Sequence, residues 1–246
     1  MVVIVGTPTY IYAMCNLYSQ TRSHEAVSKL FKVSPNRAEM IAPLQAIFPG
    51  NLAPVVRLAA DGERELVNLN WGFVRRPRDR APSRVGNVRD DQIQTNPFWR
   101  ESFVSRRCLV PVSSYSEPQG VKPATWHWFT VDREGDETSR PLFAFAGIWK
   151  TYKGPVRKDG LDVVQDVFSF MTTIPNALTA SINHERMPVL LTREDEFETW
   201  LRGTPQAAFT LARTFPAEDM HLVQSGLDRK DRLEASPAVT QSPLLL

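Results

Sequence analysis

The chain has 246 residues, of which 42% are hydrophobic and 23% charged, and its formal net charge is +2 at pH 7. This composition is that of an ordinary soluble globular protein of one large or two small domains, and no apolar run approaches the roughly 18 residues needed to span a membrane. The two cysteines, Cys15 and Cys108, exclude a disulfide framework and a four-cysteine zinc site and are typical of a reducing compartment.

The chain begins with thirteen residues, MVVIVGTPTYIYA, before a Met-Cys pair at Met14 and Cys15. This segment has no Lys or Arg ahead of its apolar run and no small-residue cleavage site, so it does not fit a secretory or lipoprotein signal. We interpret residues 1–13 as an extension that a start at Met14, or removal of a leader, would eliminate. Residues 14–224 are predicted to form one domain. Residues 225–246 turn charged and then Ser/Pro-rich, which predicts a flexible tail.

Between these ends the chain is predicted to be mostly strands. Val67, Leu69 and Trp71 alternate on one face of a predicted strand. Other strands are predicted where aromatic and β-branched runs are bounded by Pro, Gly or polar clusters, in residues 125–131, 142–149 and 167–173.

Helix starts are predicted at Ser23, at Asn96-Pro97 and at a capping box over 192–195. Strands outnumber helices and do not alternate with them. The sequence therefore predicts an α+β domain built on a curved, mostly antiparallel sheet or barrel with short flanking helices.

Positive charge concentrates in residues 75–107, which hold nine arginines against four acidic residues, a local balance of +5. The run begins with Arg75 and Arg76 and contains no lysine. Arginine alone favours planar, forked recognition of phosphate, although a solvated loop with scattered salt bridges is an equally good interpretation of the charge by itself.

Four short stretches hold polar residues that could carry chemistry. Taken singly, each has an ordinary interpretation as a turn former, a solvated residue or a hydrogen-bonded structural histidine, and none identifies a function. The candidates are Cys15 in MCNLYS, Asn87 and Arg89 in GNVRDD, Glu117 in CLVPVSSYSEP, and His184 and Arg186 in INHERMPVLL.

Taken together and in order, these stretches resemble the SRAP family, the abasic-site processing proteins also called SOS-response-associated peptidases. The resemblance covers roughly residues 14 to 224. Its motifs are MCNLYS, IAPLQ with Pro43, Trp71-Gly72-Phe73, Asn87-Val88-Arg89, RCLVP followed by Tyr115-x-Glu117, FAGIW, TTIPN and HERMPVLL. The chain departs from the family where SYSEP replaces the usual GFYEW, where Cys-Asn-Leu replaces the usual Cys-Gly-Arg opening, and in the thirteen-residue extension.

The resemblance implies that the protein cross-links to abasic sites in single-stranded DNA through an amino-terminal cysteine, here Cys15 after loss of Met14. A terminal α-amine has a pKa of about 7.7–8.0, so a fraction of the molecules carry a neutral amine at cellular pH. The neutral amine can attack the aldehyde of a ring-opened sugar. The adjacent thiol can then close a thiazolidine ring. By position, Asn87 would orient the cysteine or sugar, Glu117 would act as general acid and base, and His184 would protonate the sugar oxygen.

The resemblance also implies a DNA-binding surface. Arg89 and Arg186 would clamp phosphates and Trp71 and Phe73 would stack on unpaired bases, although Trp71 also fits a core position. The predicted interface comprises Arg89, Arg186, Trp71, Phe73, Pro43, Arg75 and Arg76. We expect no metal or cofactor, a cytoplasmic monomer associated with the nucleoid on DNA, and replication or repair proteins as partners.

Two other functions share parts of this pattern. A cysteine-dependent peptidase that removes its own leader would use the Cys15 thiol as nucleophile, but it needs an oxyanion hole and a peptide groove that the sequence does not reveal. A single-strand-binding module whose terminus is blocked would keep the fold without the chemistry.

Overall fold

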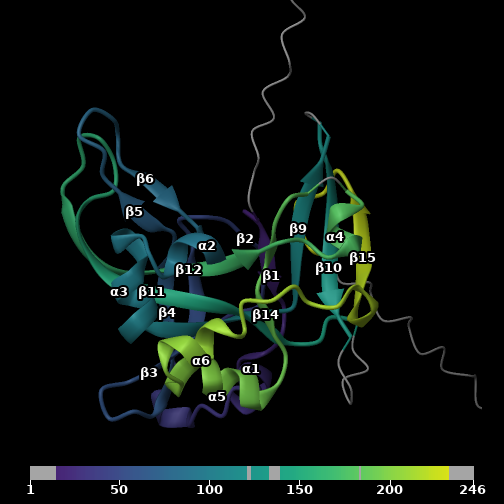
Figure 1. The fold of residues 1–246 in the computed structure, drawn as a ribbon, viewed down its shortest axis with the longest axis horizontal. Coiled ribbons are helices and arrows are strands. Elements are labelled where there is room, and N and C mark those ends of the chain that lie inside the picture. Colours follow the sequence, from purple (N-terminus) through teal and green to yellow (C-terminus); the bar gives the residue numbers. More distant parts are fainter. Residues whose placement is uncertain (1–14, 121–122, 133–138, 183, 233–246) are drawn as a thin grey trace, which may run out of the picture.

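The computed structural model describes residues 15–120, 123–132, 139–182 and 184–232 (Figure 1). The predicted extension, residues 1–13, lies outside the described residues, and so do residues 233–246 of the predicted tail.

The centre of the molecule is a five-stranded β-barrel. β12 pairs with both β4 and β11, and β4 connects through β3 and β8 back to β11, which closes the ring. Every pairing in this ring is antiparallel except that of β12 with β4. The barrel strands are β3 (Leu52–Leu58), β4 (Arg64–Trp71), β8 (Arg107–Val112), β11 (Phe143–Pro155) and β12 (Asp162–Thr173). The predicted α+β fold on a curved, mostly antiparallel barrel is confirmed.

Three short strands extend the barrel, and a separate antiparallel sheet stands beside it. β7 (Asn87–Arg89) runs parallel to β12, and β13 (Met187–Pro188) and β14 (Leu190–Leu191) pair with β12 and β11. The separate sheet has the order β15-β10-β9-β1-β2, with β15, β10 and β9 at the right of Figure 1 and β1 and β2 near its centre. Its strands are β1 (Tyr18–Gln20), β2 (Leu44–Ile47), β9 (Ser114–Gln119), β10 (Thr125–Val131) and β15 (Met220–Gly226).

A two-stranded hairpin and short helices complete the fold. The hairpin of β5 (Phe73–Arg75) and β6 (Ser83–Val85) lies at the upper left of Figure 1, away from the β9–β10–β15 sheet. The helices are α1 (His24–Leu30), α2 (Asp90–Ile93), α3 (Pro97–Ser105), α4 (Ala177–Ala180), α5 (Glu194–Arg202) and α6 (Pro205–Phe209), with 3-10 turns η1 (Pro35–Arg37) and η2 (Ala217–Asp219). Within the described ranges, no helix combines the length and hydrophobicity required to cross a bilayer.

Two of the predicted helix starts are confirmed and the third is displaced. The Ser23 side chain accepts from the Ala26 N–H, and the Asn96 side chain accepts from the Phe98 N–H. The capping box predicted over 192–195 is wrong, because α5 begins at Glu194 and the Glu196 carboxylate caps it by accepting from the N–H groups of Thr192 and Arg193. A carboxylate three residues into a helix reaches back to these otherwise unpaired donors.

The predicted alternation of β4 is confirmed, since Val67, Leu69 and Trp71 are buried in one apolar cluster. The same cluster contains Cys15 and Tyr18, so the candidate site abuts the core rather than a surface loop. Fully burying each large side chain stabilises the fold by about 1.5–3 kcal/mol, so this end of the barrel is a rigid support.

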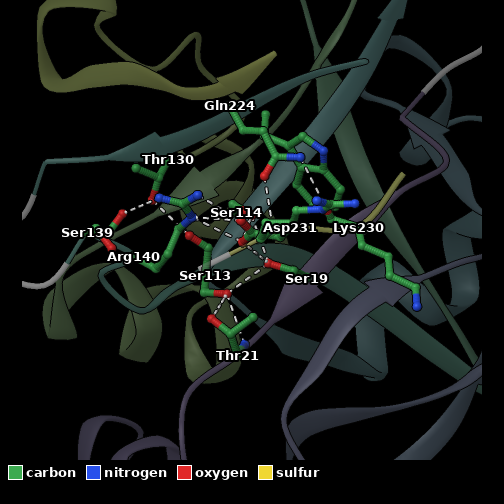
Figure 2. A network of polar contacts seen from close by, with 12 residues as sticks. Ser19, Thr21, Ser113, Ser114, Thr130, Ser139, Arg140, Gln224, Lys230 and Asp231 are labelled. Carbon is green, nitrogen blue, oxygen red and sulfur yellow. Dashed lines mark hydrogen bonds and ion pairs between the residues drawn. The ribbon is translucent and has the colours of Figure 1, made fainter. Parts of the chain in front are cut away.

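The segment after β15 crosses the separate sheet and is anchored there. We call residues 227–232 the C-terminal strap. The fully buried Asp231 carboxylate accepts hydrogen bonds from Ser19 Oγ (2.8 Å) and Ser114 Oγ (2.6 Å) and pairs with Arg140 Nη2 at 2.8 Å (Figure 2). The Asp231 N–H also donates to Gln45 O. The stretch predicted as a flexible tail therefore begins inside β15 and continues as an ordered strap to residue 232, because a buried arginine partner compensates the buried carboxylate.

Candidate active site

Sheet pairing brings four chemically capable side chains together from distant parts of the chain. Glu117 lies on β9, which pairs antiparallel with β1 so that the Ser116 N–H donates to Leu17 O at 2.9 Å. This register places Glu117 beside Cys15, which comes just before β1. Asn87 opens β7 and pairs with Phe170 of β12, while His184 lies between α4 and β13.

Cys15 is held at its backbone and is buried to 1% exposure. Asn87 Nδ2 donates a 2.7 Å hydrogen bond to Cys15 O, and the Cys15 thiol lies 3.7 Å from Leu17 O. Burial raises the pKa of the Cys15 thiol well above its ordinary value, and the nearby Glu117 carboxylate raises this pKa further. The thiol is therefore kept as a neutral group until a base accepts its proton.

Glu117 and His184 form a pair that can share one proton. His184 Nε2 lies 3.0 Å from Glu117 Oε2, and His184 Nδ1 lies 2.9 Å from Arg186 O. Because a carbonyl oxygen only accepts, Nδ1 carries a hydrogen, and Nε2 is left to exchange a proton with the carboxylate. Burial raises the pKa of Glu117, and the charge of His184 lowers it in part. A carboxyl whose pKa is raised holds its proton more readily than an exposed one, so it can donate a proton as well as accept one.

The site also holds a buried acceptor atom with no partner in the described part of the chain. Asn87 Oδ1 is inaccessible to solvent and makes no hydrogen bond among the described residues. A native fold pairs most such atoms, so an unpaired group at a reactive centre indicates a place for a substrate hydroxyl or a water. Across the described ranges, His, Cys, Asp and Glu side chains do not gather in a group of three that could hold a metal ion.

The two arginines predicted to clamp phosphate lie in different environments. Arg186 has a side chain only 12% exposed and pairs with Asp90 Oδ1 at 2.6 Å. Arg186 Nη2 also donates to Thr172 O. Arg89 is 51% exposed, and it pairs with Asp91 through both Nε and Nη2. Of these two arginines, Arg89 is therefore the exposed one, and Asp91 occupies its guanidinium in this structure.

The structure corrects the prediction that Trp71 and Phe73 stack on DNA bases. Both side chains are fully buried, so neither presents a ring face to a ligand. Trp71 Nε1 instead donates a 2.9 Å hydrogen bond to Gly86 O, and Phe73 packs against Trp99 at a centroid distance of 5.0 Å. The alternation of β4 points Trp71 into the core, which is the second interpretation that the sequence allowed.

The remaining predicted DNA-binding residues are exposed but are not brought to the Cys15 cluster. Pro43 lies in the loop before β2, and Arg75 and Arg76 lie at the end of β5 on the hairpin. Arg107, from the same arginine-rich stretch, is buried and donates to the carbonyls of Phe103 and Trp200. The basic surface is therefore narrower than the sequence predicts.

Sequence reasoning treated Asp90 and Asp91 only as charges to be counted. The structure places each on one of the two arginines of the site. Their position could have indicated this role, because the two acidic residues directly follow the Asn-Val-Arg triplet and its candidate phosphate-binding arginine.

Comparisons with known proteins show the family to which the chain is similar. The model of the family described as SOS response associated peptidase (SRAP) matches residues 14–226. The Abasic site processing protein YoqW of Bacillus subtilis (strain 168) is 31% identical over 185 residues, which cover 71% of this chain and 77% of YoqW. The Abasic site processing protein YoaM of the same organism is 30% identical over 189 residues, covering 71% of this chain and 76% of YoaM.

Solved structures share the fold. A crystal structure of a protein from Bacteroides thetaiotaomicron superposes with a TM-score of 0.63 at 22% identity, covering 85% of this chain and 92% of that one. A crystal structure of a protein from Bordetella bronchiseptica gives a TM-score of 0.64 at 19% identity, covering 85% of this chain and 100% of the other. At these identities the likeness shows the fold alone.

Proposed function

The chain belongs to the SRAP family, and from this premise we propose that it captures abasic sites in single-stranded DNA by a covalent bond to Cys15. Relatives at 30–31% identity are named abasic site processing proteins, which supports DNA with abasic sites as the partner. The observation that carries the proposal is the convergence of Asn87 on the backbone and of Glu117 on the thiol of Cys15, with His184 paired to Glu117.

The chemistry requires Cys15 to be the amino-terminal residue. Its neutral α-amine attacks the C1′ aldehyde of the ring-opened deoxyribose, and loss of one water gives an imine. The thiol then adds to the imine carbon and the nitrogen takes up the proton, which closes a five-membered thiazolidine. The sum is cysteine plus aldehyde giving thiazolidine plus water, with no oxidation or reduction.

Each neighbouring residue has a defined task in this sequence of steps. Asn87 fixes the Cys15 carbonyl through its 2.7 Å hydrogen bond, and its free Oδ1 accepts from a sugar hydroxyl. Glu117 removes the thiol proton and returns a proton to the departing water, since its raised pKa suits both directions. His184, 3.0 Å away, supplies the proton that opens the sugar ring.

We propose that the same groups also carry out strand cleavage at the abasic site (lyase activity) and reversal of the cross-link. An imine at C1′ acidifies the protons at C2′, so a base can remove one of them and expel the 3′ phosphate. Protonation of the thiazolidine sulfur by Glu117 reverses ring closure. Formation, elimination and reversal therefore compete at one carboxyl group.

The test uses a single-stranded oligonucleotide with one abasic site and protein whose chain starts at Met14. We expect a band that resists denaturation with the wild type and none with Cys15→Ala. Glu117→Gln should slow its formation roughly a hundredfold or more, the usual contribution of a general acid–base group. Cys108→Ala is the matched control, because this second buried cysteine lies on β8, where Arg57 rather than Glu117 acts on its thiol, and the band should persist. A band that survives in Cys15→Ala would refute the proposed linkage.

The state of the amino terminus separates this function from the peptidase and from an inert DNA-binding module. The intact mass of protein produced from the whole 246-residue sequence should correspond to a chain beginning at Cys15. If the active protein keeps residues 1–14, its Cys15 nitrogen is an amide and cannot form the imine. A peptide covering residues 9–19 that is cut before Cys15 by the protein would favour the peptidase.

A further inference from the structure

Two consecutive aspartates, Asp90 and Asp91, each pair with an arginine beside the site, and the two pairs differ in burial. Arg89 and Asp91 have side chains 51% and 50% exposed. Arg186 and Asp90 have side chains only 12% and 20% exposed. The difference decides which arginine is able to change partners.

The Arg89–Asp91 pair has the geometry that a phosphate would adopt on the same arginine. Asp91 Oδ1 accepts from Arg89 Nε at 3.0 Å, and Asp91 Oδ2 accepts from Arg89 Nη2 at 2.5 Å. Carboxylate and phosphate both take this two-bond arrangement on a guanidinium. The mutual attraction raises the pKa of Arg89 and lowers that of Asp91, and the charge of Glu185 also raises the pKa of Arg89.

We propose that Asp91 is an internal substitute for a DNA phosphate. Its carboxylate pairs with Arg89 in the free protein, and a phosphate of the bound strand replaces it on Arg89. This inference rests on the proposed function, in which Arg89 contacts the backbone of single-stranded DNA. The exchange is feasible because an ion pair exposed to solvent contributes little to stability. The strand phosphate therefore replaces a weak bond rather than a buried one.

The neighbouring pair is built to stay in place. Asp90 Oδ2 also accepts from Thr173 Oγ1 at 2.7 Å, and Arg186 Nη2 is also bonded to Thr172 O. Breaking the Arg186–Asp90 pair would leave two charged side chains largely shielded from water, which is much more costly than breaking an exposed pair. Because Arg186 O accepts from His184 Nδ1, this fixed pair positions His184 while Arg89 exchanges partners.

The consequence is selectivity against undamaged strands. An intact strand must displace Asp91 to gain one phosphate contact and obtains no compensating bond at Cys15. A strand with an abasic site must displace Asp91 as well, but its covalent bond to Cys15 compensates for the weaker binding at Arg89. Asp91 therefore lowers unproductive binding without limiting capture.

The test measures fluorescence anisotropy of a labelled single-stranded oligonucleotide without an abasic site, using the whole 246-residue chain at fixed low salt. We expect Asp91→Asn to bind about two- to fivefold more tightly than the wild type, since the competing carboxylate is lost. Asp61→Asn is the matched control, because it removes the same charge from an exposed carboxylate that is paired with Arg37 by two bonds in the β3–β4 turn, and it should not tighten binding. In an Arg89→Ala background, Asp91→Asn should have no effect.

The outcomes that overturn the inference are defined by the same set of variants. Unchanged or weaker binding by Asp91→Asn refutes it, as does the lack of measurable binding by both wild type and Asp91→Asn. Equal tightening by Asp61→Asn, or tightening that persists with Arg89→Ala, means that general charge repulsion is responsible and refutes the inference. Failure of the proposed function would appear separately, as the lack of a cross-linked band on abasic DNA. In that case Asp91→Asn would still bind undamaged DNA more tightly than the wild type, and this tightening would still be lost in the Arg89→Ala background.

Discussion

Asn87 Nδ2 donates a 2.7 Å hydrogen bond to the backbone carbonyl of Cys15, although 72 positions separate the two residues in the chain. This bond ties the cysteine to β7 and thereby to the barrel strand β12. The orientation of the proposed nucleophile therefore depends on an amide contributed by another sheet.

Replacement of Asn87 by alanine should slow cross-linking while the protein remains folded. The buried Cys15 carbonyl would lose its donor, a loss of about 1–3 kcal/mol, which corresponds to roughly a tenfold to hundredfold slower reaction. The measurement is the rate of band formation on abasic DNA. Asn68→Ala, at an exposed asparagine that bonds Glu39, is the control and should react at the wild-type rate. Equal rates for Asn87→Ala and the wild type would contradict the orienting role.

Replacement of Gly86 by alanine should destabilise the strand that carries Asn87. A Cβ at Gly86 would lie 2.8 Å from Trp71 Nε1, closer than real Cβ contacts, and Trp71 is fully buried. Overpacking of this kind costs about 1–3 kcal/mol, measurable by urea denaturation. Gly160→Ala is the control, because its nearest neighbour would be 3.5 Å away. The prediction fails if both variants unfold at the same urea concentration.

Replacement of Asp231 by alanine should lower the free energy of unfolding by about 3–5 kcal/mol, because it leaves the buried Arg140 without its partner. The Ser19 and Ser114 hydroxyls would lose an acceptor at the same time. Thermal unfolding followed by circular dichroism measures the change. Asp132→Ala, in an exposed pair with His221, should cost less than about 1 kcal/mol. A similar effect of the two substitutions would mean that the strap is not anchored at Asp231.

Stability should depend on pH through Glu117. Burial raises the pKa of Glu117 in the folded protein above that of the unfolded chain, which is about 4.3. The stability gained from the protonated form is therefore complete below the unfolded pKa and is lost as pH rises through the folded pKa. Glu117→Gln should then be more stable than the wild type at pH 8, by on the order of 1–3 kcal/mol, and similar to it near pH 4.

The control for the pH prediction is Glu185→Gln, at an exposed glutamate next to His184. Its unfolding free energy should follow the wild type at both pH values. A Glu117→Gln protein that is less stable than the wild type at pH 8 would show that the buried carboxylate stabilises the fold.

Replacement of Arg75 and Arg76 by alanine should reduce the salt dependence of single-strand binding. If both side chains contact phosphates, the slope of log affinity against log salt should fall by roughly 1.4, about 0.7 for each contact. The control is the double replacement of Arg193, just before α5, and Arg202, at the end of α5, whose side chains are 60% and 42% exposed. An unchanged slope for the hairpin variant would exclude the hairpin from the interface.

Local patterns predicted the parts of this fold that depend on neighbours in the chain. The caps at Ser23 and Asn96 follow from side chains that bond backbone donors two or three residues on. The start of α5 was misplaced because Glu196, rather than the residue types at 192–195, supplies the acceptor. Burial of Phe73 could not be predicted, because a three-residue strand has too little periodicity to show which face is covered.

The sequence by itself determined the family and the fold class. It also identified the candidate residues Cys15, Asn87, Glu117 and His184, because ordered motifs and strand alternation are properties of the chain. Only the tertiary structure decided which charged groups meet. In the folded protein Arg89 pairs with Asp91, Arg186 lies in a largely buried pair with Asp90, and Asp231 pairs with the buried Arg140. The reason is physical: the free energy of an ion pair or a buried ring depends on distance and on exclusion of water, and sheet register sets both between residues far apart in the chain.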